Sequence, residues 1–90
     1  MARVSLATML AERAAGRNSL LLSGRTLGEV LDALCREHPA LAPVVWEAPG
    51  TLNEFLVCFV NQRDARDLQG LATPVGAADE IMVVGAAEGG

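Results

Sequence analysis

Apolar and polar residues alternate near the start of the chain and again after residue 18. In Arg3–Ala7 the side chains of Val4 and Leu6 fall on one side of an extended backbone, which predicts a β-strand with both facing inward. A turn-like stretch at 15–18 precedes a second alternating segment at 19–23. Because a short turn between two such segments is typical of a hairpin, we expect the two strands to pair.

The apolar spacing becomes helical after Thr26. Thr26 and Glu29 have the spacing of a capping box, in which the threonine hydroxyl accepts a hydrogen bond from the Glu29 backbone and the carboxylate reaches back. Pro39 predicts the end of this helix near His38, and the segment 39–50, which holds three prolines and the single tryptophan, predicts an irregular or single-turn stretch. The apolar stripe of the helix consists of Leu27, Val30, Leu31 and Leu34.

The second half of the chain predicts more strands. The apolar run Phe55–Val60 indicates a central strand, a turn follows at 61–64, a short edge strand is expected near 65–66, and Ile81–Val84 predicts the last strand. One helix among these strands predicts an α+β fold, a β-grasp (ubiquitin-like) roll with a mixed sheet of four to five strands. We expect one domain over 1–87 and a flexible tail at 88–90.

Apolar and polar residues do not alternate in the strands predicted at 55–60 and 81–84. Such alternation is expected in a sheet that is covered on one face only. If Leu56, Cys58 and Val60 face the helix, their neighbours face the other way, and the same holds for the last strand. An apolar patch of this kind commonly marks a partner surface, although the 39–50 segment could instead fold over it or the strand could simply be well buried. The residues assigned to the partner surface are Val57, Phe59, Met82 and Val84, with Glu88 of the tail.

Composition narrows the class of protein. Half of the residues (51%) are apolar, which argues against disorder, and the formal charge is −4 with seven basic residues, all arginine. Without a basic run, counterion release cannot drive nucleic-acid binding, and an anionic membrane would repel the chain. The apolar start is interrupted at Glu12 and Arg13, and no segment approaches membrane-spanning length, so we expect a cytoplasmic protein.

Candidate catalytic and metal-binding residues are few. Cys35 and Cys58 are expected to be free, buried thiols. Cys35 and His38 have the spacing to share one metal ion, but no second pair of ligands exists, so no metal site is expected. Cys35 also lies beside the apolar stripe, which disfavours a Cys–His nucleophile. Asp79 is expected to stabilise a turn by accepting backbone hydrogen bonds.

Four short motifs stand out in the chain: Asn61 directly after an apolar strand, the segment Gly70–Thr73, Asp79 before the last strand, and the terminal pair Gly89 and Gly90. In this order they resemble the ubiquitin-like sulfur carriers of the ThiS/MoaD family. The resemblance extends over essentially the whole chain, from the first strand to the last residue, and the pattern is most similar to the CysO-type carriers of thiocarboxylate-dependent cysteine synthesis. The chain departs from the family pattern at Ala78, where glycine is usual, and at 85–88, where a proline-rich neck is usual.

The resemblance implies a function for the two terminal glycines, which could otherwise be a frayed end. In this family an ATP-dependent, ubiquitin-activating-type (MoeB/ThiF-like) enzyme adenylates the terminal carboxylate, and a sulfur donor converts it to a thiocarboxylate. Gly90 would carry the sulfur and Gly89 would allow close approach. The protein would be a cosubstrate without a bound cofactor, and its partners would include a sulfur-accepting enzyme such as a cysteine synthase and a metallopeptidase that releases product. The residues leave the destination of the sulfur open among cysteine, thiamin, molybdopterin and a sulfur-containing secondary metabolite.

Two alternatives remain from the sequence. The same Gly-Gly end could form isopeptide bonds to lysines of target proteins, as in a ubiquitin-like modifier, or the chain could be the small subunit of a molybdopterin synthase. The chain has no lysine of its own, so it could not build polymers through its side chains.

Overall fold

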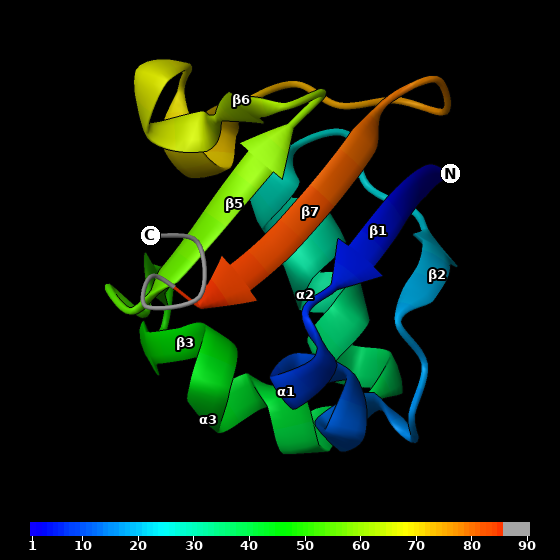
Figure 1. Cartoon of the computed structure of the whole chain (residues 1–90). Helices are drawn as coiled ribbons and strands as arrows, with labels where there is room; N and C mark the ends of the chain where they lie inside the picture. Colours follow the sequence, from blue (N-terminus) through cyan, green and yellow to red (C-terminus); the bar gives the residue numbers. More distant parts are fainter. Residues whose placement is uncertain (86–90) are drawn as a thin grey trace.

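A twisted five-stranded sheet forms the centre of the molecule, and the computed structural model describes residues 1–85 (Figure 1). The strand order is β2-β1-β7-β5-β6. Strands β1 and β7 run parallel, whereas the other neighbours are antiparallel, so the sheet is mixed. The strands are β1 (Ala2–Leu6), β2 (Ser19–Leu22), β5 (Leu56–Val60), β6 (Arg63–Asp64) and β7 (Glu80–Gly85).

One helix, α2 (Leu27–Glu37), covers one face of this sheet (Figure 1). The Thr26 hydroxyl accepts a hydrogen bond from the Glu29 backbone at 3.2 Å, which confirms the predicted cap, while the Glu29 carboxylate accepts one from the Arg25 backbone at 3.1 Å. The helix ends before Pro39, as expected. Its apolar stripe is fully buried against the sheet. A mixed five-stranded sheet covered on one face by this helix confirms the predicted α+β fold of the β-grasp type. The buried stripe is Leu27, Val30, Leu31 and Leu34.

The connection between β1 and β2 contains the turn expected at 15–18, and two short helical segments precede it. The chain forms α1 (Thr8–Ala11) and η1 (Glu12–Ala14) before Ala15 adopts a left-handed conformation with φ 56°. Burial explains these two helical segments, because the side chains of Leu10, Ala11 and Ala14 all pack in the core. The two strands still pair antiparallel, as predicted, with a helical turn between them.

The expected edge strand near 65–66 is wrong by two residues. Strand β6 is Arg63–Asp64, and η3 (Ala65–Asp67) follows it. Asp64 begins η3 by accepting a hydrogen bond from the Arg66 backbone at 2.9 Å, and Ala65 is buried. A further turn, η4 (Gly70–Ala72), packs against α2.

The segment after α2 lies on the helix side of the sheet. It contains η2 (Pro39–Leu41) and α3 (Ala42–Val45), whose residues Leu41 and Val45 are buried in the same core as α2. A small hairpin of β3 (Trp46–Ala48) and β4 (Thr51–Leu52) follows. This segment therefore does not fold over the outer face of the sheet. No helix within residues 1–85 has the length and apolar character needed to cross a bilayer.

Candidate partner-binding face of the sheet

The side chains of β5 and β7 alternate between the core and the opposite face. Leu56, Cys58 and Val60 are buried in β5, as are Ile81 and Val83 in β7. The intervening side chains point away from α2 and are half-buried or exposed, so the predicted strand phase is confirmed. Phe55, which is 70% exposed, lies one residue before β5.

Four outward-facing apolar side chains meet across these two strands. Val57 lies opposite Val84, and Phe59 lies opposite Met82 in the antiparallel register. Side chains directly opposite each other on one face of such a pair are in contact range. Met82 is 48% exposed and the other three are half-buried. We call Val57, Phe59, Met82 and Val84 the outer patch.

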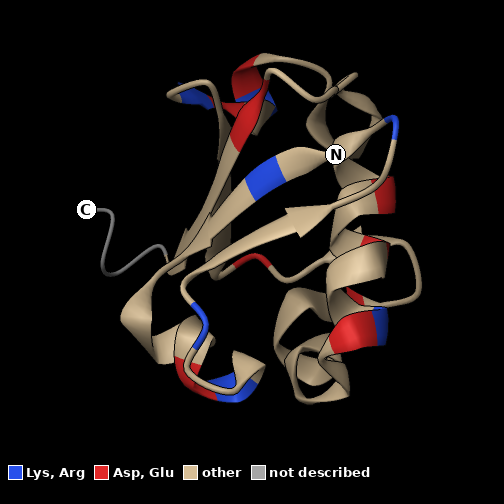
Figure 2. Ribbon diagram, turned by 90° about the vertical axis from the view of Figure 1, so that its right-hand side faces the viewer, with Lys and Arg blue, Asp and Glu red and all other residues tan. Residues whose placement is uncertain are grey.

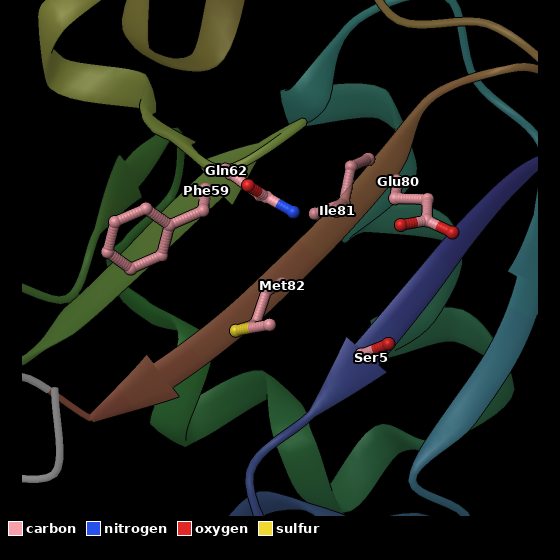
Figure 3. A pocket seen from close by; sticks show the side chains of 6 residues that line it. All are labelled: Ser5, Phe59, Gln62, Glu80, Ile81 and Met82. Carbon is pink, nitrogen blue, oxygen red and sulfur yellow. The ribbon is translucent and has the colours of Figure 1, made fainter.

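A hollow of about 270 Å³ lies beside Phe59 and Met82 (Figure 3). Its lining includes polar side chains from three places: Ser5 on β1, Gln62 in the β5–β6 turn and Glu80 at the start of β7. An apolar centre with a polar rim is the arrangement found in protein–protein interfaces. Charged residues otherwise lie mainly on helices and loops, and β2 and β5 carry none (Figure 2).

The polar rim residues Ser5, Gln62 and Glu80 were not predicted from the sequence, although strand periodicity indicates the position of two of them. Glu80 lies two residues before Met82 on β7, and the side chains of a strand alternate with a period of two, so Glu80 is on the same outer face as Met82. Ser5 of β1 lies opposite Met82 in the sheet register and is therefore on that face as well. Gln62 carries no such signal, because it lies in a turn with a positive φ of 71°.

A hydrogen-bonded turn holds the ends of β5 and β7 together. Asn61 has a left-handed backbone, with φ 51°, a conformation that asparagine tolerates well. Its side-chain amide donates to Asp79 Oδ1 at 2.8 Å, and its Oδ1 accepts from the Glu80 backbone at 3.0 Å. Asp79 Oδ2 also accepts from the Gly76 backbone at 2.7 Å, which confirms the turn role predicted for Asp79. These bonds fix the register of the two strands that carry the outer patch.

Ala78 lies in the turn before β7, at the position where the ThiS/MoaD pattern has glycine. The turn accommodates the alanine without backbone strain. The non-glycine residues of the described chain that have a positive φ are Ala15, Asn61 and Gln62. Since Ala78 is not one of them, its backbone has a conformation that any residue adopts.

The outer patch extends to the end of the last strand. Gly85 ends β7 opposite Leu56, directly after the patch residue Val84. The predicted carrier residues Gly89 and Gly90, the partner-surface residue Glu88 and the tail at 88–90 all lie outside the described residues. Their roles remain predictions, as does the partner role of the outer patch.

Neither cysteine has the properties of a nucleophile. Cys58 is 3% exposed, and burial, with a smaller effect from the Asp64 carboxylate, raises the pKa of its thiol to about 12. Cys35 is half-buried rather than fully buried, and burial and the Asp32 carboxylate raise its pKa as well. Both thiols are free. Within residues 1–85, no group of three or more His, Cys, Asp or Glu side chains is placed to hold a metal ion.

Comparison with known proteins agrees with this geometry. The model of the ThiS family matches residues 4–90. The chain belongs to the ThiS family. Sulfur carrier protein CysO of Mycobacterium tuberculosis (strain H37Rv) is 33% identical over 89 residues, which cover 97% of this chain and 96% of that protein.

Solved structures of several relatives superpose on the whole fold. The crystal structure of Mycobacterium tuberculosis CysO, an antigen, has a TM-score of 0.86 at 31% identity and covers 96% of this chain and 99% of that chain. Small archaeal modifier protein 1 of Methanosarcina acetivorans has a TM-score of 0.88 at 33% identity and covers 99% and 95%. CysO in the BexX/CysO complex of Amycolatopsis orientalis has a TM-score of 0.87 at 26% identity and covers 96% of each chain.

These matches establish the general class of the protein. It is a CysO-like member of the ThiS family with a ubiquitin-like fold, and proteins of this type are small sulfur carriers rather than enzymes. The CysO protein of Amycolatopsis orientalis forms a complex with BexX.

Proposed function

We propose that the protein carries sulfur as a thiocarboxylate on Gly90. An ATP-dependent, ubiquitin-activating-type enzyme would join the terminal carboxylate to AMP and release pyrophosphate. A sulfur donor would then displace AMP and leave a thiocarboxylate, which donates its sulfur in biosynthesis. The match to sulfur carrier protein CysO over nearly the full length of both chains is the observation that carries this proposal.

The fold suggests how the activating enzyme would be recognised. The outer patch would bind an apolar surface of that enzyme, with the rim of the hollow excluding water around the contact. Since β7 runs from the patch toward the carboxyl end, an enzyme bound there could also receive the end of the chain. Gly89 and Gly90 have no Cβ that would obstruct a narrow active-site channel.

The similarity to sulfur carrier protein CysO supports a proposal for the sulfur acceptor. We propose an acceptor enzyme of the cysteine synthase type, with a metallopeptidase that releases the product from the carrier. A thiocarboxylate suits this transfer because its sulfur is soft, ionised near neutral pH and never released as free sulfide. Both ATP and such acceptors favour a cytoplasmic location.

ATP–pyrophosphate exchange with the activating enzyme of the same organism tests the activation step. The full-length chain should support exchange, and deletion of Gly90 should abolish it while the melting curve stays unchanged. Exchange that is equally fast with the deleted chain would contradict activation at this terminus.

A second candidate function is conjugation to proteins. It is favoured by the 33% identity and TM-score of 0.88 to small archaeal modifier protein 1. A modifier would form an isopeptide bond between Gly90 and target lysines. Expression of an N-terminally tagged chain in its own host distinguishes the two: a modifier gives tagged species of higher mass that survive reductant and denaturant, whereas a pure carrier gives one band.

A further inference from the structure

A second groove lies on the helix side of the sheet, between α2 and the β3–β4 hairpin. It has a volume of about 530 Å³. Its walls combine the only tryptophan of the chain, Trp46, with Pro43 and Pro49, and two carboxylates, Asp32 and Glu47. None of the described residues that line it is basic. The groove is therefore both apolar and acidic.

Trp46 is held in place by its surroundings. The residue is half-buried and packs against the core, and it lies opposite Leu52 in the hairpin register. Trp46 also lies near the Cys35 thiol on α2 and counteracts part of the rise in the pKa of that thiol. A large aromatic ring that is already ordered loses little conformational entropy when a ligand packs on it.

Neither carboxylate of the groove forms an ion pair within the described part of the chain, although Asp32 also lines a neighbouring hollow with Arg25 and Arg36. Asp32 and Glu47 are both exposed. The one ion pair within 4.0 Å among residues 1–85 joins Arg66 to Asp64 at 2.6 Å, away from this groove. Arg36, one turn after Asp32 on α2, makes no such contact. Two exposed carboxylates beside an aromatic ring attract a cation with an apolar stem.

We propose that this groove binds an arginine side chain of a partner protein. The planar guanidinium would stack on Trp46 and donate hydrogen bonds from its N–H groups to the carboxylates of Asp32 and Glu47, while its methylene stem would pack along Pro43 and Pro49. Arginine fits better than lysine because its guanidinium is flat, weakly hydrated and carries several donors in one plane. A partner bound there leaves the outer patch free, so the inference does not rest on the sulfur-carrier proposal.

The single tryptophan provides a direct readout. The full-length protein would be titrated with the tripeptide acetyl-Ala-Arg-Ala-amide, and Trp46 fluorescence would be followed. The matched probe is the same tripeptide with citrulline, which keeps the shape of arginine but has no charge. We expect saturable binding of the arginine peptide and binding of the citrulline peptide that is weaker by about fivefold or more.

Conservative variants locate the contact. Asp32→Asn and Glu47→Gln should each weaken binding of the arginine peptide about two- to fivefold. Glu12→Gln removes the same charge from an exposed site in η1 outside the groove and should change nothing. In NMR spectra the indole N–H signal of Trp46 should move during the titration while the Met82 amide stays still. Equal affinity for the citrulline peptide, a response that does not saturate, or loss of binding in Glu12→Gln alone would overturn the proposal.

Discussion

At the residue scale, a substitution of Met82 is expected to affect partner binding but not stability. It is the most exposed member of the outer patch, at 48%, so Met82→Glu should change the free energy of unfolding by no more than about 0.5 kcal/mol. The same change should slow adenylation about tenfold or more, because the new carboxylate would be buried unpaired against the activating enzyme. Thermal melts and ATP–pyrophosphate exchange measure the two effects.

Leu21 supplies the matched control for Met82. It is 58% exposed and lies on the same face, since it pairs with Arg3, which pairs with Glu80. Leu21→Glu should leave both stability and adenylation unchanged because β2 is two strands away from β7. Equal loss of adenylation in both variants would mean that the effect comes from charge rather than from the outer patch.

Cys58 gives a prediction for the pH dependence of stability. In the unfolded chain its thiol ionises near the ordinary pKa of 9.0, whereas burial holds the pKa of the folded thiol at about 12. Between these pH values the unfolded state has lost a proton that the native state retains, so stability should fall as pH rises from 9.0 toward 12. Denaturant unfolding at several pH values should show a shallower fall for Cys58→Ala; identical slopes would contradict the assignment.

The sequence predicted which way the patch residues point, but not how far each is exposed. Phe59 is half-buried and lies between Met82 of β7 and Asp64 of β6 in the sheet register, and strand periodicity carries no information about such neighbours. Phe59→Glu is therefore expected to cost more stability than Met82→Glu. The rim residue Gln62 was missed for a related reason, since turn conformation places it there.

At the scale of elements, α2 is stabilised far more by packing than by its cap. Leu34 is fully buried, so Leu34→Ala should cost about 2–5 kcal/mol. Thr26→Ala removes one capping hydrogen bond and should cost about 1 kcal/mol. Chemical denaturation of both variants gives the comparison. If both shifts were equally small, Leu34 would not pack in the core as described.

Long periodic elements were predictable, and short connections were not. The helix α2 and strands β5 and β7 each extend over enough residues for their apolar period to be read, and all three lie close to the expected ranges. Helix α1 has four residues, too few to show a helical period. The alternating segments of β1 and β2 on either side of it therefore predicted a simple hairpin. The shift of β6 arose because Asp64 starts a helical turn through its own side chain, a local hydrogen bond that periodicity does not report.

At the scale of the whole molecule, the fold places two distinct surfaces on opposite layers. The outer patch lies on the open face of the sheet and ends beside Gly85, whereas the groove at Trp46 lies on the helix side. The sequence indicated the first surface because its strands are apolar on both faces. It did not indicate the second, since Asp32 and the β3–β4 hairpin come together through tertiary packing alone.

The mass of the intact protein after reaction with its sulfur-transfer partners tests the central claim most directly. The full-length chain would be incubated with ATP, its activating enzyme and a sulfur donor, and then analysed by mass spectrometry beside a chain that lacks Gly90. We predict a species heavier by the difference between one sulfur and one oxygen atom, formed only by the full-length chain and located by fragmentation at Gly90. A chain that is adenylated under these conditions yet never gains the sulfur mass would contradict the sulfur-carrier account.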